Sequence, residues 1–312
     1  MYQSLLELDP IRINFSGSGN VLLNLVLAFI MFGVALGMRI EHFKTLLRFP
    51  KPIGIGQFCQ FFALPFITFI LVIILNRFIT PTVAMGMILV AACPGGNISN
   101  FMTSLSKGNI ELSVTLTAIS TILAILMTPL NFKIWGSLYV NFINHKAGSM
   151  LQPLEIEYSQ MFHTVVIIVG IPMAAGLFFA IYYPKLALKI KKILQHISIL
   201  FFITLVIIMF SSNWDLFVKH IKYIFFIVLI HNGLAFLSGY SISYFFKQPD
   251  INRRTITIET GIQNSGLGLV LLFNPKIFPP ELAIGGMFFV TAWWGIWHII
   301  SGLGISFYWS RK

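Results

Sequence analysis

The stretch TIETGIQNSGL, from Thr257 to Leu267, interrupts an apolar run with one acid, two amides and two glycines. A second stretch, CPGGNISN from Cys93 to Asn100, interrupts another apolar run with proline, glycine and polar residues. Inside a membrane, unwound backbone leaves N–H and C=O groups without partners, so such breaks persist only where they are buried in protein or line a polar cavity. The two breaks therefore predict a shared polar site near the middle of the membrane.

The rest of the sequence predicts an all-α integral membrane protein. Hydrophobic residue types make up 57% of the chain, charged types make up 10%, and the mean hydropathy is +0.85. A soluble domain carries roughly 25% charged residues. Continuous apolar runs of about 20 residues recur, each long enough to cross a ~30 Å hydrocarbon core, whereas barrels show alternating segments of about 10 residues. The net charge of +11 lies largely in short loops, which argues against nucleic-acid binding.

About nine transmembrane crossings are expected, at residues 20–38, 52–75, 81–106, 111–132, 161–183, 197–210, 223–246, 255–273 and 282–309. Asn109 is predicted to cap the fourth crossing, because its side chain can accept a hydrogen bond from the first turn. Residues 133–159 are expected to form a weakly apolar connection, and PKLALKIKK, from Pro184 to Lys192, is expected to form a basic turn.

The positions of the two breaks predict an inverted-topology repeat. They lie in the third and eighth expected crossings, and this odd separation makes them enter the membrane from opposite sides. Residues 1–145 would form the first half, with its break around 94–100, and residues 146–312 the second, with its break around 259–266. The first half would lack one crossing. Transporters that work by alternating access are commonly built in this way.

The basic residues predict the orientation of the chain. About two thirds of the 21 Lys and Arg residues fall in loops on one side, which the positive-inside rule places in the cytoplasm. The N-terminus would then lie outside, and the C-terminus inside, in a multi-pass protein of the cell (inner) membrane. The first residues lack the basic start and apolar core of a signal peptide. Cys59 and Cys93 lie in apolar runs, which favours buried thiols over a metal site.

Glu259 is the acid expected deepest in a crossing. A charge at the centre of a membrane helix costs about 2.5 to 3.5 kcal/mol on insertion scales, and no Lys or Arg is expected at a similar depth. A bound cation is the simplest partner. The alternative is a protonated Glu259 that only ties helices together.

Neutral oxygen donors accompany Glu259 and favour a monovalent cation. Hard cations prefer carboxylate, amide, hydroxyl and carbonyl oxygens. Ser113 and Thr117 share one helix face, because they are four residues apart. One carboxylate among neutral donors resembles a sodium site more than a calcium or zinc site. The donors are Gln60, Ser99, Asn100, Ser113, Thr117, Gln263 and Asn264.

At these residues the chain resembles the bile acid:sodium symporter family, in particular bacterial homologues of the apical sodium-dependent bile acid transporter. The resemblance extends from the Met31-Phe32-Gly33 stretch to His298. One departure is Asn97, where a smaller Thr or Ala is expected. The matching motifs are QFFALP (Gln60 to Pro65), CPGGNISN, LSVTLT (Leu112 to Thr117) followed by TPL (Thr128 to Leu130), HNG (His231 to Gly233) and TIETGIQNSGL.

The resemblance implies a panel domain and a core domain, with two broken helices that cross beside two sodium sites. The substrate would lie close to Asn97 and Asn264, in a cleft between the domains. The first sodium site would use Ser99, Asn100, Ser113, Thr117 and Glu259. The second would use Gln60, Glu259, Thr260, Ile262 and Gln263, in part through backbone carbonyls.

The leading interpretation is a sodium-coupled symporter of organic anions, either bile-acid-like molecules or small carboxylates. The expected partners are that anion and the lipid bilayer, with no obligate protein partner. The rival within the same class is a proton-coupled exporter in which Glu259 carries the proton. An intramembrane enzyme is the remote alternative, because no nucleophile–base set is visible. His231 and His298 are interpreted as packing residues rather than cavity residues.

Overall fold

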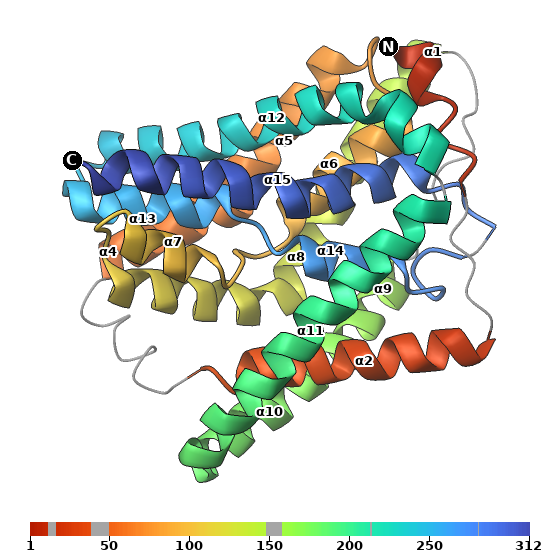
Figure 1. Cartoon of the computed structure of the whole chain (residues 1–312). Coiled ribbons are helices and arrows are strands. Elements are labelled where there is room, and N and C mark those ends of the chain that lie inside the picture. The colour runs from red at the N-terminus through yellow and green to blue at the C-terminus, as the bar shows by residue number, and fades with distance from the viewer. Residues whose placement is uncertain (12–16, 39–49, 148–157, 213, 280) are drawn as a thin grey trace.

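The computed structural model describes residues 1–11, 17–38, 50–147, 158–212, 214–279 and 281–312, and helices dominate these ranges (Figure 1). Five helical segments among them are long and apolar enough to cross a membrane. They are Pro50–Leu75, Ile110–His145, Phe162–Tyr182, Trp214–Phe245 and Gly285–Ser310. The all-helical membrane architecture expected from the sequence is therefore confirmed.

The first half of the chain begins with two separate helices, α1 (Tyr2–Leu5) and α2 (Gly17–Ala35). A continuous helical segment follows, in which the π-helical turn η1 (Cys59–Ala63) joins α4 (Pro50–Phe58) to α5 (Leu64–Leu75). Pro65 explains the wide turn, since it lacks the N–H that a regular helix would use at that point. A similar π turn, η2 (Val166–Gly170), precedes Pro172 and joins α9 (Tyr158–Val165) to α10 (Ile171–Tyr182).

Each of the two predicted breaks separates a pair of short helices. The first separates α6 (Pro81–Ala92) from α7 (Ser99–Leu105). The second separates α13 (Asp250–Gly261) from α14 (Ser265–Leu272). Proline and glycine end α6, whereas Asn264 starts α14 by accepting a hydrogen bond from the Leu267 N–H at 3.0 Å, as a helix cap does.

The fourth crossing is longer than the sequence predicted. Helix α8 spans Ile110–Ala147, so residues 133–147 are helical and the expected connection is wrong there; residues 148–157 lie outside the described ranges. The extension is held by packing, since the Trp135 ring contacts the rings of Phe66 and Phe69 in α5 and Tyr139 is buried. The Asn109 cap is confirmed by a 3.0 Å bond from the Leu112 N–H to its side-chain oxygen.

The expected basic turn is also helical. Helix α11 covers Pro184–Ser212 and follows α10 after the single residue Tyr183. Proline suits the first position of a helix, where its missing N–H is not needed, and the sequence after it contains no further breaker. The remaining long helices are α12 (Trp214–Phe245) and α15 (Gly285–Ser310).

The elements pack into two groups. Helix α2 packs against α10 and α11, in the lower part of Figure 1. The broken pairs, α4–α5, α8, α12 and α15 form the larger bundle above them. Small residues allow close approach in both groups. A Cβ on Gly176 would lie 2.6 Å from the Phe32 carbonyl oxygen, and one on Gly86 would lie 2.7 Å from the Met287 Cα.

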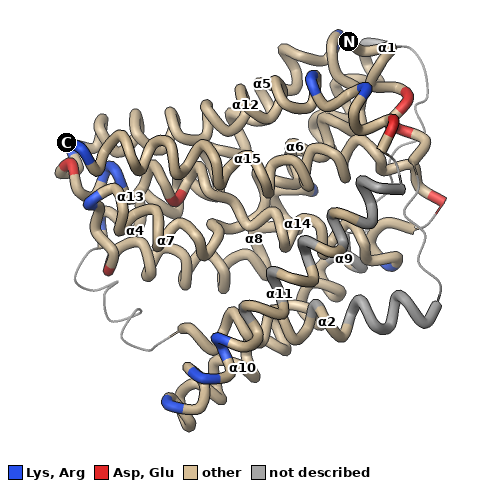
Figure 2. The backbone as a smooth tube through the Cα atoms, in the orientation of Figure 1, with Lys and Arg blue, Asp and Glu red and all other residues tan. Residues whose placement is uncertain are grey.

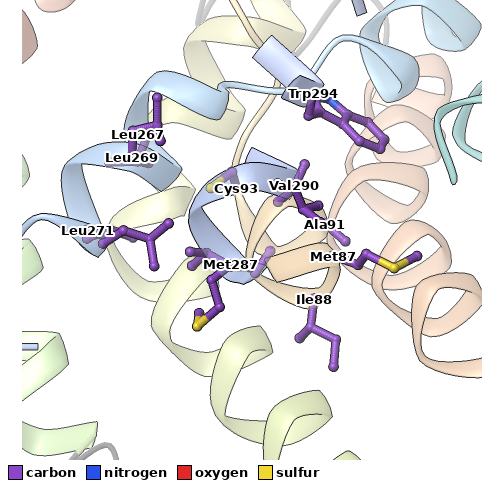
Figure 3. Close-up of a cluster of buried hydrophobic side chains, with 14 of the residues drawn as sticks. Met87, Ile88, Ala91, Cys93, Leu267, Leu269, Leu271, Met287, Val290 and Trp294 are labelled. Carbon is purple, nitrogen blue, oxygen red and sulfur yellow. The ribbon is translucent and has the colours of Figure 1, made fainter. Parts of the chain in front are cut away.

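The core of the larger bundle lies where α6, α14 and α15 meet (Figure 3). Met87, Ile88 and Ala91 of α6 face Met287, Val290 and Trp294 of α15, and all six are buried. Lys and Arg gather beside the C-terminus and where α10 meets α11, while the acids lie mainly at the opposite end (Figure 2). The apolar core thus surrounds the two breaks, and most charge stays at the helix ends.

Candidate functional site

The two breaks pair with each other through their backbones. Gly95 and Gln263 form an antiparallel β-bridge. The Gly96 N–H donates to the Ile262 carbonyl at 2.7 Å, and the Asn264 N–H donates to the Pro94 carbonyl at 2.8 Å. Groups that helix unwinding leaves without partners therefore satisfy one another, as burial in a membrane protein demands. The pairing also places both breaks at one point of the bundle.

Glu259 lies next to this crossing, in the last turn of α13, with 3% of its surface exposed. Three hydroxyl groups donate to its carboxylate. Ser99 and Ser113 donate to Oε2 at 2.6 and 3.3 Å, and Thr117 donates to Oε1 at 2.6 Å. We call Glu259, Ser99, Ser113 and Thr117 the hydroxyl cluster. It joins α7, α8 and α13 around a single carboxylate.

Gly95 makes room for the hydroxyl cluster. A Cβ at this position would lie 2.5 Å from Oε1 of Glu259, so any larger residue would press on the carboxylate. Asn100, which the family resemblance adds to the first sodium set, lies at the edge of the cluster. Its side-chain oxygen is 3.5 Å from the Thr117 hydroxyl. The structure therefore brings all five residues of that expected set together.

A second group of polar side chains contacts the crossing from η1, and we call Gln60 and Gln263 the amide pair. Gln60 Nε2 donates to Gln263 Oε1 at 2.7 Å and to the Cys93 carbonyl at 2.8 Å. Gln263 Nε2 donates to the Thr260 carbonyl at 2.7 Å. The amide pair thus links η1 to both breaks, and it brings together Gln60, Thr260 and Gln263 of the second expected set. The other two members are held elsewhere, since the Ile262 carbonyl accepts from the Gly96 N–H and Glu259 lies in the hydroxyl cluster.

No Lys, Arg or His within the described ranges pairs with the charge of Glu259. Among the residues that the structure describes, the salt bridges involve Glu7 and Asp250 rather than Glu259. Buried carboxylates are tolerated when hydrogen bonds or a cation offset the lost hydration. Carboxylate, hydroxyl and amide oxygens at one point form a donor set that suits a small hard cation better than a soft one.

The two residues expected near the substrate differ in their surroundings. Asn97 is exposed just before α7, whereas Asn264 is half-buried and already uses its side-chain oxygen to cap α14. Both flank the paired breaks.

The buried His231 has a packing role. Its Nε2 lies 2.7 Å from the Thr68 hydroxyl, and its ring packs edge-on against Trp294. These contacts agree with the interpretation of His231 as a packing residue. Cys59 and Cys93 are free buried thiols, as predicted.

Sequence reasoning missed contacts that only the fold creates. Asn232 donates to the Gly261 carbonyl at 2.7 Å, and Ser301 donates to Asn232 at 2.6 Å. The HNG motif singled out Asn232 without a role. Ser301 gave no signal, because a serine in an apolar helix is ordinary.

Comparison with known proteins identifies the family. The model described as "Sodium Bile acid symporter family" matches residues 24–220, which include the first break. The chain belongs to this family. Members of the family are transporters rather than enzymes.

Three relatives show how widely the similarity extends. The chain is 32% identical over 290 residues to "Uncharacterized sodium-dependent transporter YocS" of Bacillus subtilis (strain 168), covering 93% of this chain and 83% of the relative. It is 30% identical to "Probable sodium/metabolite cotransporter BASS2, chloroplastic" of Oryza sativa subsp. japonica, over 86% and 62% of the two chains. It is 28% identical to the "Ileal sodium/bile acid cotransporter" of Oryctolagus cuniculus, over 82% and 71%.

Proposed function

We propose that this protein is a sodium-coupled symporter of organic anions that works by alternating access. The observation that carries the proposal is the hydroxyl cluster, in which a buried Glu259 receives three hydroxyl hydrogen bonds beside two paired helix breaks. In the part of the chain that the structure describes, this carboxylate forms no salt bridge. Family membership supports transport, and the names of the relatives support sodium coupling.

Two sodium ions would bind, one at each side of Glu259. The first would be held by Ser99, Asn100, Ser113, Thr117 and Glu259, and the second by Gln60, Glu259, Thr260, Ile262 and Gln263. Each ion moving inward gains about 2.3 kcal/mol per 100 mV of membrane potential. Two ions with a monovalent anion would carry net positive charge inward, so the potential would drive accumulation.

The amides at the breaks would recognise the organic anion. Asn97 is exposed, and Asn264 commits its side-chain oxygen to α14 but not its nitrogen. Amide N–H groups near a helix N-terminus favour a carboxylate. Bile-acid-like molecules and small carboxylates both carry this group.

The same proposal includes the arrangement of the helices in the membrane. Nine crossings would form an inverted repeat of residues 1–145 and 146–312, with α2, α10 and α11 as a panel and the larger bundle as a core. The distribution of Lys and Arg supports an N-terminus outside the cell (inner) membrane and a C-terminus in the cytoplasm.

Uptake into proteoliposomes tests the function. A panel of radiolabelled organic anions, including a bile acid and short carboxylates, is offered with an inward sodium gradient, with potassium in its place, and with a proton gradient alone. We expect uptake that depends on sodium. Uptake or efflux driven only by the proton gradient would instead support the exporter in which Glu259 carries a proton.

A further inference from the structure

Helix α12 contacts the second break at the Gly261 carbonyl, where α13 ends. Asn232 is fully buried and donates to the Gly261 carbonyl at 2.7 Å. One turn further along α12, Phe236 packs so closely that a Cβ on Gly261 would lie 2.2 Å from its ring. The last carbonyls of a helix have no partner within it, so Asn232 satisfies a group that would otherwise be unpaired inside the membrane.

The amide of Asn232 is itself oriented from α15. Ser301 donates to Asn232 Oδ1 at 2.6 Å. An amide that accepts on its oxygen must present its nitrogen to the other partner, so the serine fixes which end of Asn232 faces Gly261. The bonded chain therefore runs from α15 through α12 to the end of α13.

Adjacent carbonyls of the second break are held by different donors. The Gly261 carbonyl is held by α12, and the Ile262 carbonyl is held by the Gly96 N–H of the first break. Glu259 precedes this pair of carbonyls and Gln263 follows it. The directions of the Glu259 and Gln263 side chains thus depend on the Gly261 peptide unit between them, which Asn232 fixes.

We propose that Asn232, oriented by Ser301, is a positioning residue for sodium binding. It fixes the Gly261 peptide, and it thereby holds Glu259 and Gln263 in the geometry that binds the ion, without touching the ion itself. The inference rests on the proposed sodium coupling. Removing a partner that orients a metal ligand typically costs about 10- to 100-fold in metal affinity.

The test measures sodium-dependent thermal stabilisation of the purified full-length protein, with sodium chloride titrated against potassium chloride at constant ionic strength. A ligand that binds only the folded state raises its stability by mass action, so the midpoint of the titration reports sodium affinity alone. We expect Asn232→Ala to raise the midpoint about 10-fold or more. Asn232→Asp should behave similarly, because it keeps the acceptor for Ser301 but loses the donor to Gly261.

Two further variants separate positioning from simple packing. Ser301→Ala should raise the midpoint by a smaller factor, and Ser301→Thr, which keeps the hydroxyl, should restore it. Ser238→Ala is the matched control, because the hydroxyl of this buried serine donates to the Ala235 carbonyl of its own helix α12 and bonds to no other described residue. The midpoint of this variant should stay unchanged.

The decisive contrary result is an Asn232→Ala protein that melts at a lower temperature without sodium but keeps the wild-type sodium midpoint. Asn232 would then only stabilise the fold. If Asn232→Ala fails to fold, Ser301→Ala decides, and an unchanged midpoint there overturns the proposal. The wild-type titration is a separate arm: no stabilisation by sodium over potassium would count against the proposed function itself.

Discussion

The hydroxyl cluster and the amide pair flank the same crossing but are built in different ways. In the hydroxyl cluster, side chains of α7 and α8 converge on one carboxylate of α13. In the amide pair, side chains bond to each other and to backbone carbonyls at the breaks. The hydroxyl cluster can therefore lose a member and remain folded, whereas the amide pair also holds the breaks in place. Substitutions in the hydroxyl cluster should therefore lower mainly the affinity for the ion, whereas substitutions in the amide pair should also lower the stability of the fold.

The largest effect is expected at Glu259, the residue that both expected ion sets share. Glu259→Gln keeps the size of the side chain and removes its charge, so sodium-driven uptake should fall to the background of empty liposomes. Uptake in proteoliposomes measures this. A Glu259→Gln protein with normal sodium-stimulated uptake would leave Glu259 as a structural residue and remove the basis of the comparison.

The next effect should come from the amide pair. Gln263→Ala removes the bond that the Thr260 carbonyl accepts and one of the two bonds that the Gln60 amide donates, while the bond of Gln60 to the Cys93 carbonyl remains. Each unsatisfied buried polar group costs about 1–3 kcal/mol. We expect a lower melting temperature without sodium as well as strongly impaired uptake. A Gln263→Ala protein as stable as the wild type would show that the amide pair does not hold the breaks.

The hydroxyl cluster should give the opposite pattern. Ser113→Ala combined with Thr117→Ala removes two donors to Glu259 from the unbroken helix α8, so sodium should stabilise the protein only at higher concentrations. Melting without sodium should change less than in Gln263→Ala. Thermal titration with sodium chloride provides both quantities.

Asn97→Ala is the matched comparison for that double variant, because Asn97 is exposed at the first break and bonds to none of the hydroxyl cluster. It should alter apparent substrate affinity or preference while the sodium titration stays unchanged. Ion and substrate affinities are linked, but each residue contacts one ligand directly. If Asn97→Ala abolished sodium stabilisation and the double variant retained it, the two roles would be reversed.

The smallest effect concerns the ends of the broken crossings. Lys107 follows α7 and Lys247 precedes α13, and both have positive φ angles, of 56° and 54°. Glycine is favoured in that conformation. A left-handed residue other than glycine is strained by roughly 1–2 kcal/mol, and the extra flexibility of glycine in the unfolded chain costs roughly 0.5–1 kcal/mol, so Lys107→Gly and Lys247→Gly should each stabilise the protein by at most about 1 kcal/mol. Equal gains in melting temperature would mean that both broken crossings unfold with the whole protein. A gain at only one would indicate that the other opens separately.

The sequence predicted the positions of the two breaks better than it predicted the lengths of the helices. Pro94, Gly95 and Gly96 cannot continue a helix, and Glu259 cannot lie in an apolar crossing without a partner, so local chemistry was sufficient there. The extension of α8 to Ala147 was missed because its stability comes from tertiary packing around Tyr139 rather than from hydropathy. The local pattern of hydropathy along the sequence does not indicate such tertiary contacts.

The bonds around the second break were equally hidden. Asn232 and Gly261 are distant in sequence, and their bond exists only because α12 packs along α13. The reciprocal bonds of Gln60 and Gln263 also depend on the fold. A sequence can suggest which side chains are polar at a given depth, but partners on other helices follow from the packing.

The backbone hydrogen bonds between the two breaks make the exchange of two amide hydrogens a measure of how often the breaks separate. The amides of Gly96 and Asn264 are each bonded to the opposite break, and they can exchange their hydrogens with solvent only when the crossing itself separates. If transport moves the two breaks as one body, deuterium should enter these amides at the same slow rate whether or not the protein is turning over. If instead each cycle parts the breaks, their labelling should accelerate with every round of uptake.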